Sequence, residues 1–164
     1  MNPSSIPAGV VNAETAISNA FQAWEAASKG KVDFIQGTPT TLKAAKYDGQ
    51  NIVAWGNVRY GQAIAVAYTW YDPETGHVVE VDTILSSKLA WRFTSVSNPD
   101  AVCGDFCCYD VQNILTHEIG HWVGLDDLYD AADKDLTMYG YGAKGELKKD
   151  TLASGDVLGI DAIY

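Results

Sequence analysis

The chain has no long hydrophobic run and few basic residues, and both absences limit what it can do. No apolar stretch approaches the ~20 residues that a transmembrane helix requires, so we expect no membrane span. Lysine and arginine together number 11 against 21 aspartates and glutamates, which gives a formal net charge of -10. Because proteins bind a phosphate backbone through clustered Lys and Arg, this balance argues against a nucleic-acid partner.

Cysteine is scarce as well, with only three residues in the chain. Cys103, Cys107 and Cys108 lie close together, and we expect a short-range disulfide from Cys103 to Cys107 or Cys108, with isolated buried thiols as the alternative. No histidine or fourth cysteine lies near enough in sequence to complete a tetrahedral metal site there. No signal peptide precedes Met1, so we expect a chain that is either cytosolic or has lost a leader.

The length and composition are those of one globular domain. A chain of 164 residues is long enough to bury about two-thirds of its unfolded surface around a single core. Hydrophobic residues make up 47% and charged residues 20% of the chain, which is ordinary for a globular protein. We find no internal repeat, low-complexity tract or linker, and therefore expect a single domain over residues 1–164.

Hydrophobic spacing predicts a helix, then strands, then two further helices. Residues 13–28 carry apolar side chains at helical intervals, with Asn12 as the expected cap. Four runs rich in β-branched and aromatic residues are the expected strands, 32–35, 51–55, 63–70 and 77–85. The Asp-Pro-Glu-Thr-Gly stretch at 72–76 predicts a hairpin connection between the last two.

The second helix is expected to begin at the cap residue Asp110 and to stop at Gly124. The segment that follows, up to about residue 151, is rich in Asp, Gly and Tyr and has the composition of loops. A closing helix over 152–164 is expected to be capped by Ser154. Its inward-facing residues should be Val157, Leu158, Ile160 and Ile163.

The second predicted helix carries His117 and His121, with Glu118 between them. Histidines four residues apart lie on the same helix face about one turn from each other, so both imidazoles can reach one metal ion. The glutamate can then sit beside a metal-bound water, as in zinc hydrolases. Alone the pattern is only suggestive, because a helix with two solvated histidines also fits it.

A third protein ligand from the downstream chain has to be a carboxylate, because the remaining histidine, His77, lies upstream in a predicted strand. At Gly124 the chain can take a left-handed turn back toward the metal, since glycine adopts that conformation without a Cβ clash. Asp127 follows three residues later and is the preferred ligand. The other downstream candidates are Asp126, Asp130 and Glu146.

The stretch from His117 to Asp127 reads HExxHxxGxxD and resembles the motif of the metzincin clan, with aspartate in place of the usual third histidine, as in snapalysin-like peptidases. Residues 136–141, Leu-Thr-Met-Tyr-Gly-Tyr, resemble the Met-turn of that clan. The resemblance implies that Met138 forms the hydrophobic floor of the site without touching the metal. Three further segments are similar to the matrixin family, residues 16–24, residues 76–82 followed by Trp91, and residues 152–164.

This resemblance implies an α+β metzincin catalytic domain, with a twisted mixed β-sheet packed on two long helices. Residues 1–124 would form the upper subdomain, and residues 125–164 a small lower subdomain with the Met-turn and the closing helix. Matrixins usually begin with a β-strand ahead of the first helix, and here little chain is left for it. One catalytic zinc is implied, because the histidine-rich structural zinc site of animal matrixins has no counterpart where only His77 is available.

The resemblance also implies a function, that of a secreted, monomeric zinc metalloendopeptidase acting on proteins or peptides. Glu118 would take a proton from the zinc-bound water and deliver it to the departing amine. An extended substrate would pair with the edge strand near Ala65 and Ala67. Tyr139 and Tyr141 would line the pocket for the side chain after the cut or hydrogen-bond the oxyanion, unless they are ordinary packing or surface residues.

Two other functions stay open on sequence alone. A non-catalytic binding protein on a metzincin scaffold would have no need of a base at Glu118, and an aminopeptidase would need an acidic anchor for a free amino terminus. Calcium is a further expected cation, at an acidic cluster whose spacing matches no EF-hand loop and which fits a solvated turn equally well. The cluster comprises Asp126, Asp127, Asp130, Asp133 and Asp135.

Overall fold

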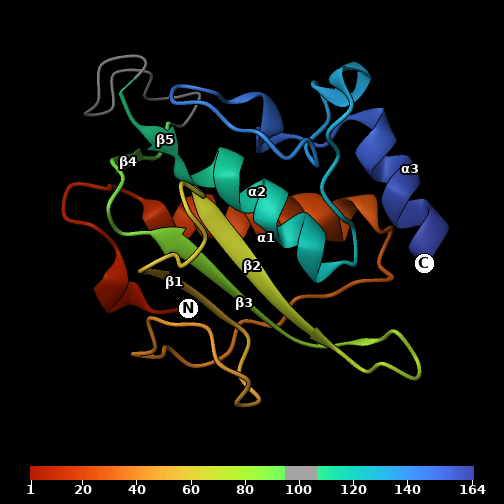
Figure 1. Ribbon diagram of the computed structural model, residues 1–164, viewed down its shortest axis with the longest axis horizontal. Helices are drawn as coiled ribbons and strands as arrows, with labels where there is room; N and C mark the ends of the chain where they lie inside the picture. The colour runs from red at the N-terminus through yellow and green to blue at the C-terminus, as the bar shows by residue number, and fades with distance from the viewer. Residues whose placement is uncertain (95–106) are drawn as a thin grey trace.

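The computed structural model of the chain describes residues 1–94 and 107–164. The fold is α+β, as expected, with α1 (Ala13–Ala27) and α2 (Val111–Trp122) packed against each other and lying on one face of the main sheet (Figure 1). A third helix, α3 (Ser154–Ile163), ends the chain. No helix among the described residues is long and apolar enough to cross a membrane.

The main sheet has three strands in the order β1-β3-β2, namely β1 (Ile52–Gly56), β3 (Val78–Ser86) and β2 (Ala65–Tyr71). The central strand β3 pairs in parallel with β1 and antiparallel with β2, so the sheet is mixed. Strand β2 therefore lies at an edge of the sheet. Two short strands, β4 (Trp91–Arg92) and β5 (Tyr109–Asp110), form a separate parallel pair just before α2.

The predicted hairpin joins β2 to β3. The Asp72 carboxylate accepts hydrogen bonds from the backbone N–H groups of Glu74 (2.8 Å) and Thr75 (3.2 Å), and Gly76 takes a positive φ of 73°. These are the contacts that make aspartate and glycine favourable in tight turns. The hairpin extends well beyond the helices at the lower right of Figure 1.

The core lies between the two long helices and the sheet. Trp24 is completely buried and donates its indole N–H to the carbonyl oxygen of Thr116, at 2.7 Å. This bond joins α1 to α2 at the residue that precedes His117. Packing against α1 and the sheet thus fixes the position of α2, the helix that carries the histidines.

Helix α2 has the predicted boundaries. The Asp110 carboxylate caps its first turn by accepting the N–H of Asn113 at 3.0 Å. Just past its last turn Gly124 takes a φ of 89°, the left-handed conformation that glycine adopts without strain. The chain can therefore turn back sharply after the helix.

The strand predicted over 32–35 does not form. The N–H of Val32 donates to the Ser28 hydroxyl at 3.1 Å, and the N–H of Phe34 donates to the Glu25 carboxylate at 2.8 Å. Both amides are thus bound by side chains at the end of α1, and not by a neighbouring strand. The Phe34 ring packs edge-on against Phe21, with ring centroids 4.9 Å apart, which explains why the run is apolar.

Asn12 is the N-cap residue of α1, as predicted, but it takes a positive φ of 58° and its side chain makes no capping hydrogen bond. Its carbonyl oxygen accepts the N–H groups of Thr15 and Ala16. The capping prediction for α3 was wrong. Ser154 is the first helical residue of α3 and does not cap it. The first turn of α3 is held by the Asp156 carboxylate, which accepts the backbone N–H of Ala153 at 2.9 Å.

The inward face of α3 also differs from the prediction. Ile160 is buried, but Leu158 and Ile163 are 69% and 48% exposed. The other buried residue of α3 is Asp156, one turn before Ile160. Its carboxylate accepts the backbone N–H groups of Thr137 and Met138 beneath α2. A buried acidic side chain with backbone partners is not visible in a pattern of apolar residues.

Near the N-terminus, Pro3–Ser5 forms a short 3-10 turn, and no strand precedes α1 in the described chain. Asn2 donates its N–H to the carbonyl of Val53 in β1 at 2.9 Å. Cys108 is buried and disulfide-bonded. Cys103 lies outside the described residues, so the predicted pairing stays a prediction.

Candidate metal centre

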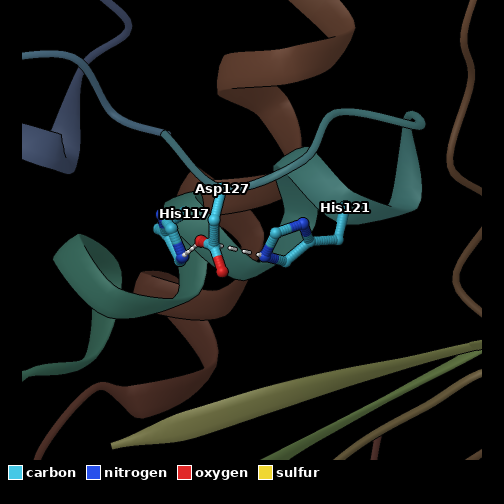
Figure 2. Close-up of side chains that lie close together, drawn as sticks. All are labelled: His117, His121 and Asp127. Carbon is cyan, nitrogen blue, oxygen red and sulfur yellow. Dashed lines mark ion pairs between the residues drawn. The ribbon is translucent and has the colours of Figure 1, made fainter. Parts of the chain in front are cut away.

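His117 and His121 extend from the same face of α2, with ring centroids 5.1 Å apart. Asp127 approaches them from the chain that returns after Gly124, as Figure 2 shows. The return is held by the N–H of Leu125, which donates to the carbonyl of Gly120 at 3.0 Å. The glycine turn predicted from sequence therefore brings the aspartate over the histidine face.

The three predicted ligands meet at one point. Oδ1 of Asp127 lies 3.1 Å from Nε2 of His117 and 3.7 Å from Nε2 of His121. One ligand atom from each residue lies within 4.8 Å of the others, and no other such group of His, Cys, Asp or Glu occurs in the described parts of the chain. The competing carboxylates, those of Asp126, Asp130 and Glu146, are not part of this group. The expected calcium site at the acidic cluster is not supported either.

Both histidines present the same nitrogen to this point. Nδ1 of His117 lies 2.8 Å from the carbonyl oxygen of Thr137, and Nδ1 of His121 lies 2.7 Å from that of Leu125. A carbonyl oxygen only accepts, so each Nδ1 carries the proton and each neutral ring turns the lone pair of Nε2 toward Asp127. Outer hydrogen bonds of this kind orient metal-binding histidines.

These donors fit zinc. Oδ1 of Asp127 is buried and has no hydrogen-bond partner among the described residues. An aspartate carboxyl is ionised at neutral pH, so Asp127 offers an anionic oxygen. Lone pairs on two neutral nitrogens and one anionic oxygen repel each other unless a cation lies among them. Two imidazoles and a carboxylate are a ligand set that zinc takes in catalytic sites.

Tyr129 supports the centre and was missed in the sequence. Its hydroxyl donates to Oδ2 of Asp127 at 2.9 Å, which leaves Oδ1 directed at the histidines. The ring packs against Gly140, where an added Cβ would lie only 2.5 Å from a Tyr129 ring carbon. Only a contact between two loops places this tyrosine, so no local pattern identifies it.

Glu118 lies between the two histidines on α2 and is 5% exposed. Burial raises the pKa of its carboxyl, and the neighbouring imidazoles and the backbone of Ala67 in β2 partly oppose that increase. A raised pKa brings a carboxylate closer to the proton affinity that a base needs near neutral pH. The environment therefore suits the role predicted for Glu118.

A cleft of about 900 Å³ runs past these residues. Strand β2 lines it with Ala65 and Ala67, and Tyr141 lines it as well. Tyr139 does not line the cleft; its ring packs against that of Tyr141, with centroids 5.5 Å apart. A second cavity of about 1110 Å³, bordered by Trp122, is lined by none of the predicted ligands.

Met138 is buried directly beneath α2. A Cβ built on Gly120 would lie 2.1 Å from the Met138 sulfur, so the thioether occupies the space that this glycine leaves between the two histidines. Asp156 holds the turn by accepting the N–H groups of Thr137 (2.9 Å) and Met138 (3.0 Å). The buried aspartate of α3 thus fixes the carbonyl that binds His117.

The chain was compared with known protein families and curated proteins. A family model described as Matrixin matches residues 4–164. Comparison with curated proteins gives no match. The match covers all three helices, the main sheet and the candidate metal centre. The chain therefore belongs to the matrixin family, whose members are zinc-dependent metallopeptidases.

Proposed function

We propose that the protein is a zinc metalloendopeptidase in which His117, His121 and Asp127 hold one catalytic zinc ion. The observation that carries the proposal is the position of Asp127 Oδ1. It is buried without a hydrogen-bond donor among the described residues and faces two nitrogens whose rings are already fixed through Nδ1. Three protein ligands are the number found in catalytic zinc sites, whereas structural sites have four.

Glu118 is the proposed general base. Bound zinc supplies a Lewis acid that polarises the scissile carbonyl and makes water more acidic. Glu118 accepts the proton of the attacking water and then donates it to the departing amine. Its burial favours both steps, because a raised pKa allows the carboxyl to hold a proton between them. Met138 serves as the apolar floor that keeps the helix rigid beneath the site.

The edge strand β2 is the proposed binding site for an extended substrate. Its free edge borders the cleft, and Ala65 and Ala67 place only small side chains there. Main-chain pairing with a sheet edge recognises the backbone of any extended segment, which suits cleavage within a chain. Tyr141 also lines this cleft and is a proposed contact for the substrate.

We further propose that the protein is secreted and monomeric. The disulfide at Cys108 supports an extracellular location, since disulfides persist in oxidising compartments. The monomeric state rests on the family resemblance.

The test is digestion of a denatured protein, with and without acetylated amino termini, by the zinc-loaded enzyme. We expect internal cuts that acetylation leaves unchanged, that disappear with a chelator and that return with added zinc. Stepwise loss of terminal residues that acetylation blocks would show an aminopeptidase. A fully zinc-loaded protein that cuts neither substrate would favour a non-catalytic binding role.

A further inference from the structure

A lysine lies buried in the wall of the cleft. Lys149 is 2% exposed and belongs to a short 3-10 turn, Lys148–Asp150. The turn packs on α2, where the backbone N–H of Lys149 donates to Oδ1 of Asn113 at 2.8 Å. Asn113 precedes His117 by four residues, which is about 6 Å along a helix axis. The backbone of Lys149 therefore contacts α2 about one helical turn before His117.

The ammonium group has few partners for a buried charge. It donates to the carbonyl oxygen of Tyr139, and among the described residues no second acceptor lies within hydrogen-bond distance and no carboxylate within 4.0 Å. An ammonium has three N–H donors. Burial lowers the pKa of Lys149, and the more distant Glu146 only partly opposes this change. A buried cation is costly unless it is paired, and this ammonium has no carboxylate at ion-pair distance among the described residues.

The surroundings of this cation form a recess suited to one side chain. Ile114 of α2, Tyr141 and Gly142 line the cleft together with Lys149. At Gly142 an added Cβ would lie 3.1 Å from the Ile114 side chain, so the two walls approach closely there. These three neighbours are apolar or aromatic, and Lys149 is the one lysine or arginine among the residues that line the cleft.

We propose that Lys149 is a specificity determinant that binds a substrate carboxylate next to the cleaved bond, and so selects peptides with Asp or Glu at that position. This inference rests on the proposed endopeptidase function. An acidic side chain suits cleavage within a chain, and a free C-terminal carboxylate offers the same chemistry. An ammonium and a carboxylate form charge-assisted hydrogen bonds, which are stronger than neutral ones.

Lys148 provides a matched control on the same turn. Its side chain is 36% exposed, and its ammonium lies 5.7 Å from the centroid of the Tyr139 ring and does not line the cleft. Lys148→Met and Lys149→Met change the net charge by the same amount and keep a similar side-chain length. Only the second removes the cation from the recess.

The experiment measures kcat/KM of the zinc-loaded enzyme on acetylated, amidated peptides that differ at one position beside the cut, Glu against Gln and Asp against Asn. A second pair, with free or amidated C-termini and Gln beside the cut, tests the terminal carboxylate. We expect the parent and Lys148→Met to prefer Glu over Gln by about ten-fold or more. Lys149→Met should reduce that ratio to about one.

Each result has a separate meaning. No cleavage of any peptide by the zinc-loaded parent would contradict the proposed function. Cleavage in which the parent treats Glu and Gln alike, or in which Lys149→Met keeps the preference, would overturn the role of Lys149. A preference confined to free C-termini would assign the carboxylate to the chain end and contradict selection of acidic side chains. If Lys149→Met does not fold, the parent Glu to Gln ratio alone decides, because a ratio near one overturns the inference.

Discussion

Asp127 is contacted from two sides, and each of its oxygens has a different neighbour. Oδ2 accepts the hydroxyl of Tyr129 at 2.9 Å, while Oδ1 faces Nε2 of His117 at 3.1 Å. The hydrogen bond to Asp127 raises the pKa of Tyr129, so the phenol remains a neutral donor. Such outer contacts fix the orientation of a metal ligand and strengthen metal binding.

Replacing Tyr129 with Phe removes this donor and keeps the ring. We expect zinc affinity to fall about 10-fold to 100-fold, because Asp127 becomes free to rotate. Competition with a chromogenic chelator measures the affinity directly. Tyr141→Phe is the control, since that hydroxyl has no bond to Asp127 in the structure although its ring packs on Tyr129. Equal zinc affinity in Tyr129→Phe and the parent would show that the hydroxyl does not position Asp127.

Some of these residues can be predicted from the sequence and others cannot, for a physical reason. Helical spacing alone identifies His117, His121 and Glu118, and a glycine turn makes Asp127 accessible. Tyr129 and Lys149 act through contacts between loops distant in sequence. The Gly-Glu-Leu-Lys-Lys stretch before Asp150 reads as solvated surface, and nothing local shows that one lysine stem turns inward.

At the level of elements, the predictions succeeded where local bonding determines the structure. Helix α2 has its own cap at Asp110, and the β2–β3 hairpin has its own turn at Asp72. The strand expected over 32–35 failed, because a strand needs a neighbouring strand and these amides bind side chains at the end of α1. The two-residue strands β4 and β5 were not predicted, because so short a pair leaves no periodic signal.

The turn under the metal centre depends on one side chain of the closing helix. The Asp156 carboxylate accepts three backbone N–H groups, from Thr137, Met138 and Ala153. Thr137 in turn offers its carbonyl to His117. Helix α3 is therefore coupled to the metal centre through this buried carboxylate.

Asp156→Asn tests this coupling. The amide replaces one acceptor oxygen with an NH₂ that faces a backbone N–H, so we expect a loss of about 2–4 kcal/mol in the free energy of unfolding and weaker zinc binding. Urea unfolding with chelator present measures the first effect, and chelator competition the second. Asp161→Asn is the control, because Asp161 forms an exposed ion pair with Lys29 at 2.7 Å. Its loss should lower the free energy of unfolding by about 0.5 kcal/mol or less. Equal losses in the two variants would contradict the role given to Asp156.

For the whole molecule, buried acidic groups make stability depend on pH. Burial raises the pKa of Asp150 to about 7 and that of Asp82 to about 6, from an ordinary value of 3.8. The folded protein therefore holds protons that the unfolded chain releases, and the associated stability is fully present below about pH 4 and lost as pH rises through these values.

Asp150→Asn should flatten this dependence. Between about pH 5 and pH 8, we expect the variant to gain about 1–2 kcal/mol in free energy of unfolding relative to the parent, because it removes a charge whose formation burial opposes. Denaturant unfolding of the variant and the parent at both pH values measures this gain. Subtracting the parent's free energy of unfolding at each pH cancels the effects that are common to both proteins. Asp135→Asn, at an exposed aspartate, should show no such gain. A parallel shift of both variants would contradict the assignment to Asp150.

The proposed metal also joins the two predicted subdomains. His117, Glu118 and His121 belong to residues 1–124, and Asp127 belongs to residues 125–164. Zinc bound among them would link the helix-sheet layer to the loops and closing helix that follow. The division itself stays a prediction.

The central claim is that this chain cuts peptide bonds with zinc and the base Glu118. The most direct test measures zinc content and cleavage of a denatured protein for the parent and Glu118→Ala in parallel, with chelator treatment and zinc restored. We predict that both proteins bind one zinc per chain and that the variant loses turnover by about 10²-fold to 10⁴-fold or more, because only the base is removed. A zinc-loaded Glu118→Ala that cleaves at nearly the parent rate would contradict the account.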